Sequence, residues 1–171
     1  SAAAAAVFLL ALFSKENAIT FLAVVPLAYY FFTKAELGTI LRQWLPLFVA
    51  ALCFLAVRFS VLGFGLAEPV TEMMNNPFIK VAGDRYVPFT ASEKLATVTY
   101  TLGKYLQLLI FPHPLTHGYY PRQVGVMHWG DWRVLLSLLV YLGLIGWAVR
   151  GGFRKDPVSF GILYFLATLS I

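Results

Sequence analysis

Charged residues are scarce in this chain, because Lys, Arg, Asp and Glu together make up only 12% of its 171 residues. An average soluble domain carries about 25% charged residues, and disordered chains are more polar still. Hydrophobic residues reach 60% of the chain, against about 45–50% in an average soluble domain. This composition excludes the ordinary cytosolic and disordered classes and predicts an integral membrane protein.

Cysteine is also nearly absent. The single Cys53 excludes an intrachain disulfide, so the chain is not a disulfide-stabilised secreted domain. The net charge is +5, yet Lys and Arg form no run or patch typical of nucleic-acid-binding proteins. We therefore predict no nucleic acid partner and attribute the positive charge to orientation in a bilayer.

Several catalytic motifs are missing as well. The chain contains no Gly-rich phosphate loop, no Gly-x-Ser-x-Gly and no His-Glu-x-x-His. Its three histidines, His113, His117 and His128, have a spacing that matches no known zinc arrangement. We therefore predict no metal site among these residues and no cofactor, with a divalent metal as the alternative.

Long apolar stretches are what the chain does contain. In lipid every backbone N–H and C=O must be satisfied within its own segment, so such stretches form helices, and spanning takes roughly 20 residues. We predict an all-α polytopic transmembrane helix bundle with about five spans, at residues 2–13, 18–32, 44–62, 132–149 and 158–171. Since the chain starts and ends inside apolar stretches, we expect residues 1–171 to be a single transmembrane domain fragment with truncated first and last helices.

Proline and tryptophan positions refine this expectation. Pro26 lies inside the second predicted helix and should bend it, whereas Pro46 falls in the first turn of the third, where its missing N–H matters little. Trp44, Trp132 and Trp147 lie near predicted span ends, as expected for an aromatic belt at the membrane surface.

Residues 92–111 have a different pattern. One helical face carries Leu95, Val98, Leu102, Leu106 and Leu109, and another carries Lys94, Thr97, Thr101 and Lys104. A lysine near the middle of a span costs about 2.5–3.5 kcal/mol on insertion scales. We predict an amphipathic re-entrant or interfacial helix here, with a true span as the alternative.

Positive charges indicate the orientation. Two short breaks, residues 33–43 and 150–157, carry five cations between them: Lys34, Arg42, Arg150, Arg154 and Lys155. The positive-inside rule assigns such breaks to the cytoplasmic side. If residues 92–111 do not cross, the two longer outer loops, 63–91 and 112–131, face the lumen or periplasm together.

Three charged residues stand out among the apolar stretches. Lys15 and Glu16 lie in a four-residue break, and Arg58 lies near the end of the third predicted span, on the same side of the membrane. One interpretation is structural: a self-neutralising turn and an arginine that extends to the interface. The functional interpretation is that Lys15 attracts an anionic head group and that Arg58 faces a cavity and pairs with Glu16.

The second outer loop concentrates groups that suit sugar or phosphate. His113, His117, Tyr119, Tyr120 and Arg122 lie close together in the sequence after the amphipathic helix. Aromatic rings stack on sugar faces, and arginine makes bidentate contacts to phosphate. The simpler interpretation is that these side chains are polar residues of the membrane interface.

Four sequence patches carry a family resemblance: SKENAITFLAVVPLAYY from Ser14, LAVRFSVLG from Leu55, NPF from Asn76 and KYLQLLIFPHPLTHGYYP from Lys104. Their order and approximate spacing resemble those of the TMTC-type membrane proteins, which carry a GT-C-like membrane region followed by tetratricopeptide repeats. The resemblance covers most of residues 8–132.

The resemblance implies a multi-pass glycosyltransferase of the bacterial inner membrane or the endoplasmic reticulum membrane. Such enzymes are thought to transfer a mannose-like sugar from a polyprenyl-phosphate carrier to a protein hydroxyl on the outer or lumenal side. Lys15 and Glu16 match the family's Lys-Glu pair, and Arg58 matches its helix arginine. Its Pro-x-x-Leu-containing loop is matched by Pro112, Leu115 and Tyr119. Family members usually have an acidic residue where this chain has Gly118, and their catalytic carboxylate lies in an earlier outer loop. The implied partners are membrane lipid, the polyprenyl-phosphate-sugar donor and a protein acceptor.

Two other functions are alternatives. A non-catalytic scaffold subunit of a larger complex would use the amphipathic helix at residues 92–111 as a docking surface. A transporter would need polar or charged residues near the middle of several helices. Only Arg58 approaches that position, so we rank the transporter last.

Overall fold

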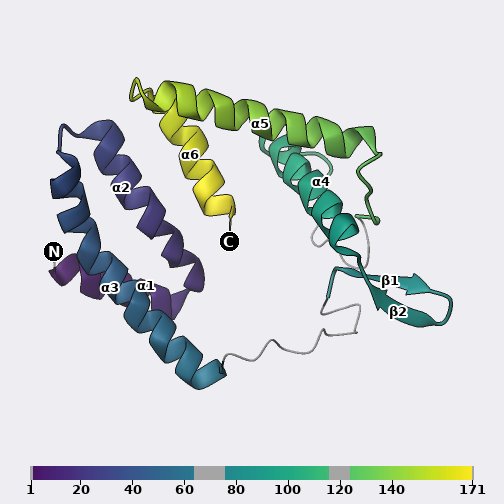
Figure 1. Cartoon of the computed structure of the whole chain (residues 1–171), viewed down its shortest axis with the longest axis horizontal. Coiled ribbons are helices and arrows are strands. Elements are labelled where there is room, and N and C mark those ends of the chain that lie inside the picture. The colour runs from purple at the N-terminus through teal and green to yellow at the C-terminus, as the bar shows by residue number, and fades with distance from the viewer. Residues whose placement is uncertain (1, 64–75, 116–123, 171) are drawn as a thin grey trace. The chain divides into compact units, whose positions relative to one another are not determined.

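The structure is a computed structural model of the chain and describes residues 2–63, 76–115 and 124–170 (Figure 1). Helices account for 74% of these residues, which confirms a mostly helical fold. The elements in chain order are α1 (Ala2–Ser14), the short 3-10 helix η1 (Glu16–Thr20), α2 (Phe21–Phe32), α3 (Leu37–Leu62), β1 (Ile79–Ala82), β2 (Arg85–Pro88), α4 (Ala91–Ile110), α5 (Trp132–Gly152) and α6 (Pro157–Leu169).

The single domain expected for residues 1–171 divides into two compact units. Unit 1 consists of Ser1–Gly65 and Leu144–Ile171, and unit 2 consists of Leu66–Gly143. Each unit has its own small cluster of buried hydrophobic side chains.

Two of the described helices, α3 with 26 residues and α5 with 21, are long and apolar enough to cross a membrane. In each helix, only 22% of the most apolar 18-residue segment is buried within the structure. The core helix of a soluble protein would instead be mostly buried. The helices α1, α6 and the η1–α2 segment are apolar but shorter. The five spans therefore remain a prediction. Of the helices concerned, α3 and α5 have the length that crossing a membrane requires.

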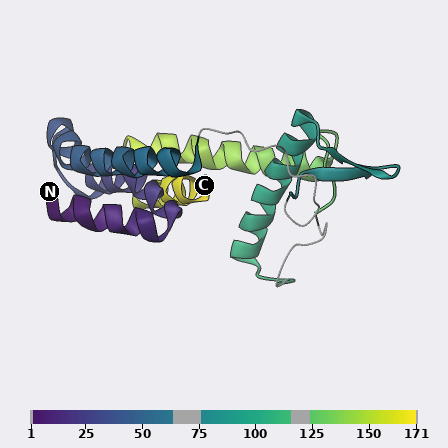
Figure 2. The same cartoon turned by 90° about the horizontal axis from the view of Figure 1, so that it is seen from below.

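The core of unit 1 lies between α1 and α3, which pack side by side (Figures 1 and 2). Phe8 and Leu12 of α1 are buried against Leu47, Ala51 and Phe54 of α3. Helix α2 contacts both α3 and α6. Small residues such as Ala51 let two helix backbones approach closely, an arrangement common among helices in membranes.

Helix α3 begins earlier than its sequence predicted. The predicted break at residues 33–43 is only four residues long, because Glu36 is extended and the helix starts at Leu37. Ile40, which the prediction left in the break, is buried and anchors the first turns. Pro46 consequently lies inside α3, and its assignment to a first turn was wrong.

Pro26 lies inside α2, as predicted, and its consequence is visible. Since proline has no N–H, the carbonyl of Leu22, four residues earlier, loses its helical donor. The indole Nε1–H of Trp44 donates to this carbonyl at 2.7 Å. Trp44 is therefore a half-buried contact between α3 and α2, seven residues after the start of α3.

Unit 2 contains an antiparallel hairpin, which corrects the all-α expectation for the loop at residues 63–91. Strands β1 and β2 pair from Ile79↔Pro88 to Ala82↔Arg85, around a two-residue turn of Gly83 and Asp84. Gly83 has φ +62°, a value that favours glycine and that such tight turns require.

Helix α4 starts with a capping box. The Thr90 hydroxyl accepts from the Glu93 N–H at 3.2 Å, and the Glu93 carboxylate accepts from the Thr90 N–H at 2.9 Å. The face that packs is made of small and polar residues, with Ala96 and Thr97 buried, whereas Leu95 and Leu109 of the predicted apolar face are exposed.

Close contact between α4 and the first half of α5 depends on one glycine. A Cβ on Gly103 would lie 2.6 Å from the Ser137 hydroxyl oxygen. The Ser137 hydroxyl donates to the Thr99 carbonyl at 2.5 Å, and the Tyr141 hydroxyl to the Leu102 carbonyl at 3.1 Å. These contacts hold α4 against α5 beside Lys104.

Candidate functional site

Unit 1 brings two of the predicted site residues together. Glu16, in the first turn of η1, forms an ion pair with Arg58 of α3. The pairing confirms the contact expected from their positions in the sequence. The Arg58 side chain is 34% exposed and that of Glu16 60%, so the pair lies at the surface of the described residues.

Lys15 lies beside this pair in the sequence but takes no part in it. It separates α1 from η1 in an extended conformation and is exposed. Among the described residues, no carboxylate forms an ion pair with Lys15. The Arg58 charge is therefore partly neutralised by Glu16, and Lys15 is the cation available to an external anion.

The other predicted site residues are in the second outer loop. His113 is exposed, and its ring lies 6.0 Å from that of Phe111 in an edge-on arrangement. His117, Tyr119, Tyr120 and Arg122 lie outside the described residues. Within residues 2–63, 76–115 and 124–170, no three His, Cys, Asp or Glu side chains are grouped as a metal site.

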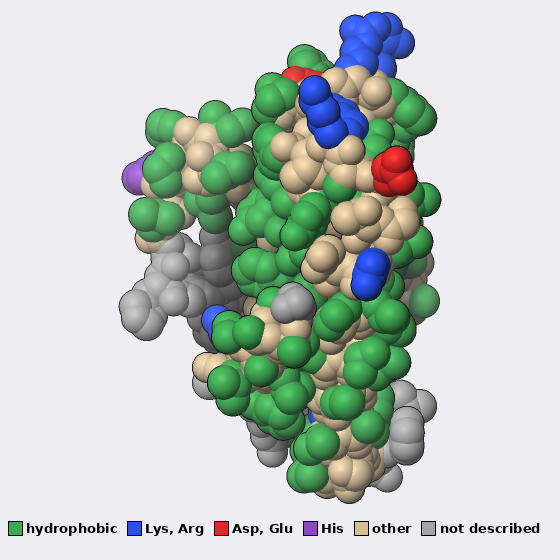
Figure 3. Space-filling view, turned by 90° about the vertical axis from the view of Figure 1, so that its left-hand side faces the viewer, with side chains coloured by type: hydrophobic (Ala, Val, Ile, Leu, Met, Phe, Trp, Pro, Cys, Tyr) green, Lys and Arg blue, Asp and Glu red, His purple; other side chains and the backbone are tan. Residues whose placement is uncertain are grey.

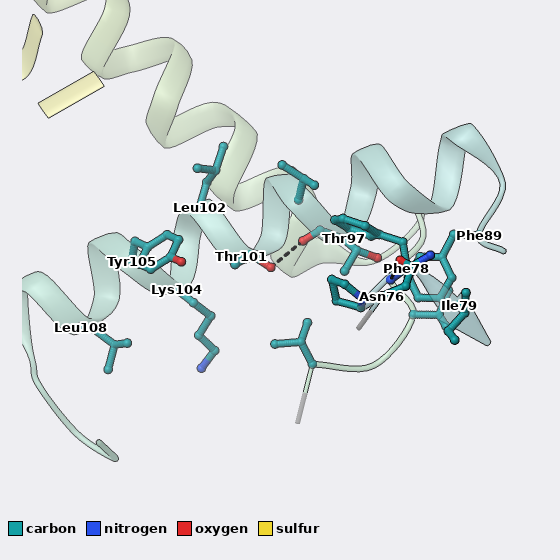
Figure 4. A pocket seen from close by; sticks show the side chains of 14 residues that line it. Asn76, Phe78, Ile79, Phe89, Thr97, Thr101, Leu102, Lys104, Tyr105 and Leu108 are labelled. Atoms are coloured by element: carbon teal, nitrogen blue, oxygen red, sulfur yellow. Dashed lines mark hydrogen bonds between the residues drawn. The ribbon is translucent and has the colours of Figure 1, made fainter. Parts of the chain in front are cut away.

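Unit 2 contains a groove of about 310 Å³ that sequence reasoning missed (Figure 4). One wall is α4, and the others are the hairpin and the segment before α5. Most of the lining is apolar: Pro77, Phe78, Ile79, Phe89, Val98, Leu102, Leu108, Val124 and Val126. The polar lining residues are Asn76, Thr97, Thr101, Lys104 and Tyr105. Lys104 and Leu108 project from the same side of α4, while Phe78 and Ile79 group at the other end.

Polar contacts hold the hairpin, which forms one wall of the groove, against α4. The Lys80 ammonium donates to the Glu93 carboxylate at 2.5 Å, and Glu93 also accepts from the Thr90 N–H. The hydrogen bond from Lys80, followed by that from Thr90, lowers the pKa of Glu93 to about 2. Glu93 is therefore ionised at neutral pH and joins β1 to the start of α4.

A second pocket of about 390 Å³ lies between α4 and the first half of α5 and shares Lys104 with the groove. Two cations lie beside one ring here: the Lys104 ammonium is 5.9 Å and the Arg133 guanidinium 5.4 Å from the centre of Tyr100. Trp132, which is 70% exposed, adds a second aromatic side chain.

The two cations differ in their partners. Arg133 makes a bidentate pair with Asp131, at 3.0 and 2.7 Å, which lowers the pKa of Asp131 to about 2. Lys104 donates to the Gln107 side-chain oxygen at 2.9 Å and forms no ion pair with a carboxylate of the described residues. Lys104 is thus a cation at the junction of an apolar groove and a pocket with aromatic walls.

This arrangement suits an amphiphile. An apolar chain fits the groove, an anionic group fits the ammonium of Lys104, and a planar or sugar-like face fits Tyr100 and Trp132. Lys104 belongs to the amphipathic helix predicted at residues 92–111, and a lysine would be costly near the middle of a span. That cost was the signal for a site, but it was used only to argue that the helix does not cross the membrane.

Comparisons of the chain with protein-family models, with curated proteins and with solved structures find no match.

Proposed function

We propose that this chain is part of an integral membrane glycosyltransferase of the GT-C-like, TMTC-type class, and that unit 2 binds its polyprenyl-phosphate-sugar donor. The observation that carries the donor-binding proposal is the position of Lys104, shared by an apolar groove and a pocket containing Tyr100, Arg133 and Trp132. The class of reaction comes from the four sequence patches that resemble the family.

Each part of the donor has a matching surface. The polyprenyl chain is flexible and wholly apolar, like the residues that line the groove. The phosphate carries negative charge that Lys104 stabilises, since a hydrogen bond to a charged group contributes about 1.5–3 kcal/mol. The sugar occupies the second pocket, where the exposed Trp132 offers an apolar ring face.

In the proposed reaction, the oxygen of a protein hydroxyl attacks the anomeric carbon of the sugar. The bond from that carbon to the phosphate oxygen breaks, and the polyprenyl phosphate leaves with the electron pair. Lys104 stabilises the negative charge that develops on the leaving phosphate. In the family that the chain resembles, the hydroxyl proton is taken by a carboxylate of an earlier outer loop, and we assign no base within this chain.

Binding of a short-chain polyprenyl phosphate in mixed micelles tests the donor site. We expect Lys104→Gln to weaken this binding by about tenfold or more, because one charge-assisted contact is lost. Arg85→Gln is the matched control: it removes one positive charge from the same unit, and Arg85 of β2 is exposed and lines neither pocket. Equal affinity of the Lys104→Gln variant and the unaltered protein would contradict the donor site.

Sugar transfer separates the enzyme from the scaffold. Membranes containing the full-length protein should move labelled sugar from a polyprenyl-phosphate carrier to a protein hydroxyl, and Lys104→Gln should slow this transfer. Donor binding without any transfer would instead favour the non-catalytic scaffold subunit.

A further inference from the structure

Unit 1 has a strongly basic end that the proposed function does not use. Two turns form it: residues 33–36 between α2 and α3, and residues 153–156 between α5 and α6. Together with the last turn of α5, they carry four cations and two carboxylates: Lys34, Arg150, Arg154, Lys155, Glu36 and Asp156. In Figure 3, Lys and Arg side chains are densest toward one end of a largely hydrophobic face, with Asp or Glu side chains near them.

Direct contacts hold the two turns together. The Lys155 ammonium donates to the Thr33 carbonyl at 3.2 Å and lies 5.0 Å from the centre of the Tyr30 ring. The Tyr30 hydroxyl donates to the Gly152 carbonyl at 3.2 Å. The basic end is therefore one surface, built from two segments about 120 residues apart in the sequence and joined by hydrogen bonds.

The turn before α6 is itself tightly built. A Cβ on Gly151 would lie against the Ser159 hydroxyl, so a larger residue there would require the Ser159 side chain to move. The Arg154 N–H and the Asp156 N–H both donate to the Gly151 carbonyl, at 3.0 and 3.1 Å. The Asp156 carboxylate caps α6 by accepting from the Ser159 N–H at 3.2 Å. One of the two carboxylates is thus engaged within the turn.

The cations of this surface face outward without ion-pair partners. Lys34, Arg150 and Arg154 are exposed, and none of them belongs to an ion pair among the described residues. Only Lys155 has a described role, as the contact between the turns. A ligand that carries several negative charges on a broad surface would match this set.

Exposed aromatic side chains distinguish a lipid surface from a soluble anion. Phe153 is 82% exposed and lies in the sequence between Arg150 and Arg154. Trp147 and Phe32, which lie nearer the apolar parts of their helices, are 61% and 60% exposed. Cations at the phosphate level with aromatic rings beside them are typical of a membrane–water interface, whereas free phosphate has no use for an exposed phenylalanine.

We infer that the basic end of unit 1 binds the head groups of an anionic phospholipid bilayer, with Phe153 inserted among them. This inference does not depend on the proposed glycosyltransferase activity. Polybasic segments beside membrane helices gain about 1 kcal/mol per Lys or Arg from anionic lipid, which corresponds to about fivefold in affinity for each cation.

Lipid binding to the purified chain in non-ionic detergent tests the inference. Phosphatidylglycerol or phosphatidylcholine is added in mixed micelles, and bound lipid is measured by native mass spectrometry. We expect phosphatidylglycerol to bind in preference, and Arg150→Gln/Arg154→Gln to weaken its binding on the order of twentyfold. The matched control Arg85→Gln/Lys94→Gln removes two positive charges from unit 2, and we expect less than a twofold change.

Three results would overturn the inference: equal binding of the two lipids, equal loss in the two double variants, or phosphatidylglycerol binding unaffected by Arg150→Gln/Arg154→Gln. Phe153→Ser distinguishes the source of the phosphate. Weaker phosphatidylglycerol binding by this variant supports a lipid surface. Unchanged binding, together with equal competition by inorganic phosphate at the same concentration, would instead identify a site for the free ion. Thermal unfolding of each variant verifies that the fold is retained.

Discussion

Trp44 replaces the backbone hydrogen bond that Pro26 removes from α2. The Leu22 carbonyl would otherwise lack a donor in an apolar bundle, and an unsatisfied buried polar group costs about 1–3 kcal/mol. We therefore expect Trp44→Phe, which keeps an aromatic ring but removes the N–H, to lower the free energy of unfolding by about that amount. Chemical unfolding in detergent measures it.

Trp147→Phe is the control for this prediction, because Trp147 is 61% exposed on α5 and makes no described hydrogen bond. We expect almost no change in its unfolding free energy. Equal stability of the Trp44→Phe variant and the unaltered protein would show that another donor, such as water, satisfies the Leu22 carbonyl.

The cluster of Lys15, Glu16 and Arg58 makes a second prediction for single residues. If this cluster, and not Lys104, neutralises the donor phosphate, Lys15→Met and Arg58→Gln should each slow sugar transfer by the full-length protein by about tenfold or more, while Lys104→Gln leaves it unchanged. Arg42→Gln, which removes an exposed and unpaired cation from α3, should leave transfer unchanged. Unchanged turnover in both cluster variants would rule out a charge clamp at this position.

At the scale of elements, Glu93 joins the hairpin to α4 and makes that junction sensitive to pH. Its pKa is lowered from 4.5 to about 2, mainly by Lys80. A lowered pKa in the folded state stabilises the fold above the ordinary value, and this contribution is lost as the pH falls toward the lowered value. We expect the stability difference between the unaltered protein and Glu93→Gln to be largest near neutral pH and to disappear between about pH 4.5 and 2.

Unfolding midpoints measured from pH 7 down to pH 2 test this behaviour. Asp84→Asn serves as the control, because Asp84 lies in the turn of the same hairpin and forms no described ion pair. Its pH profile should match that of the unaltered protein. A constant difference between Glu93→Gln and the unaltered protein across this range would contradict the role of the carboxylate charge.

Some elements were predictable because their signal is local. The start of α4 follows from Thr90 and Glu93, three residues apart before an amphipathic run. The hairpin was missed, although Gly83-Asp84 between two short β-prone runs is a signal for it. The start of α3 was misplaced because Ile40 becomes buried only through tertiary packing.

At the scale of the whole molecule, the side of the membrane reached by each loop is the main prediction. If α4 does not cross the membrane, Asp84 and His113 lie on one side, and Lys34 lies on the other. In a Cys53→Ser background, an impermeant thiol reagent should label Asp84→Cys and His113→Cys from the same side of sealed vesicles. It should label Lys34→Cys only from the opposite side.

The labelling results separate the two interpretations of α4. Opposite-side labelling of Asp84→Cys and His113→Cys would make α4 a true span. Vesicles opened with detergent provide the control, because all three cysteines should then react. A cysteine that stays unreactive there is shielded by packing and carries no information on topology.

The sequence by itself predicted a membrane protein, since so high an apolar content and so few charges are compatible with few environments other than a membrane. The structure supports this prediction with two helices, α3 and α5, that are long and apolar enough to cross one. It also located most helices, because their apolar stretches are local. It identified Lys15, Glu16 and Arg58 as unusual, because a charge in an apolar setting is costly wherever the chain folds.

Tertiary structure alone decided most contacts of the charged residues. Lys155 reaches Thr33 across 122 positions of the chain, and Lys104 lies where two pockets meet, whereas the pairing of Arg58 with Glu16 was already expected from the sequence. No local pattern encodes such contacts, because they depend on the distances between packed helices. The small residues at those interfaces, such as Gly103 facing Ser137, set the distances.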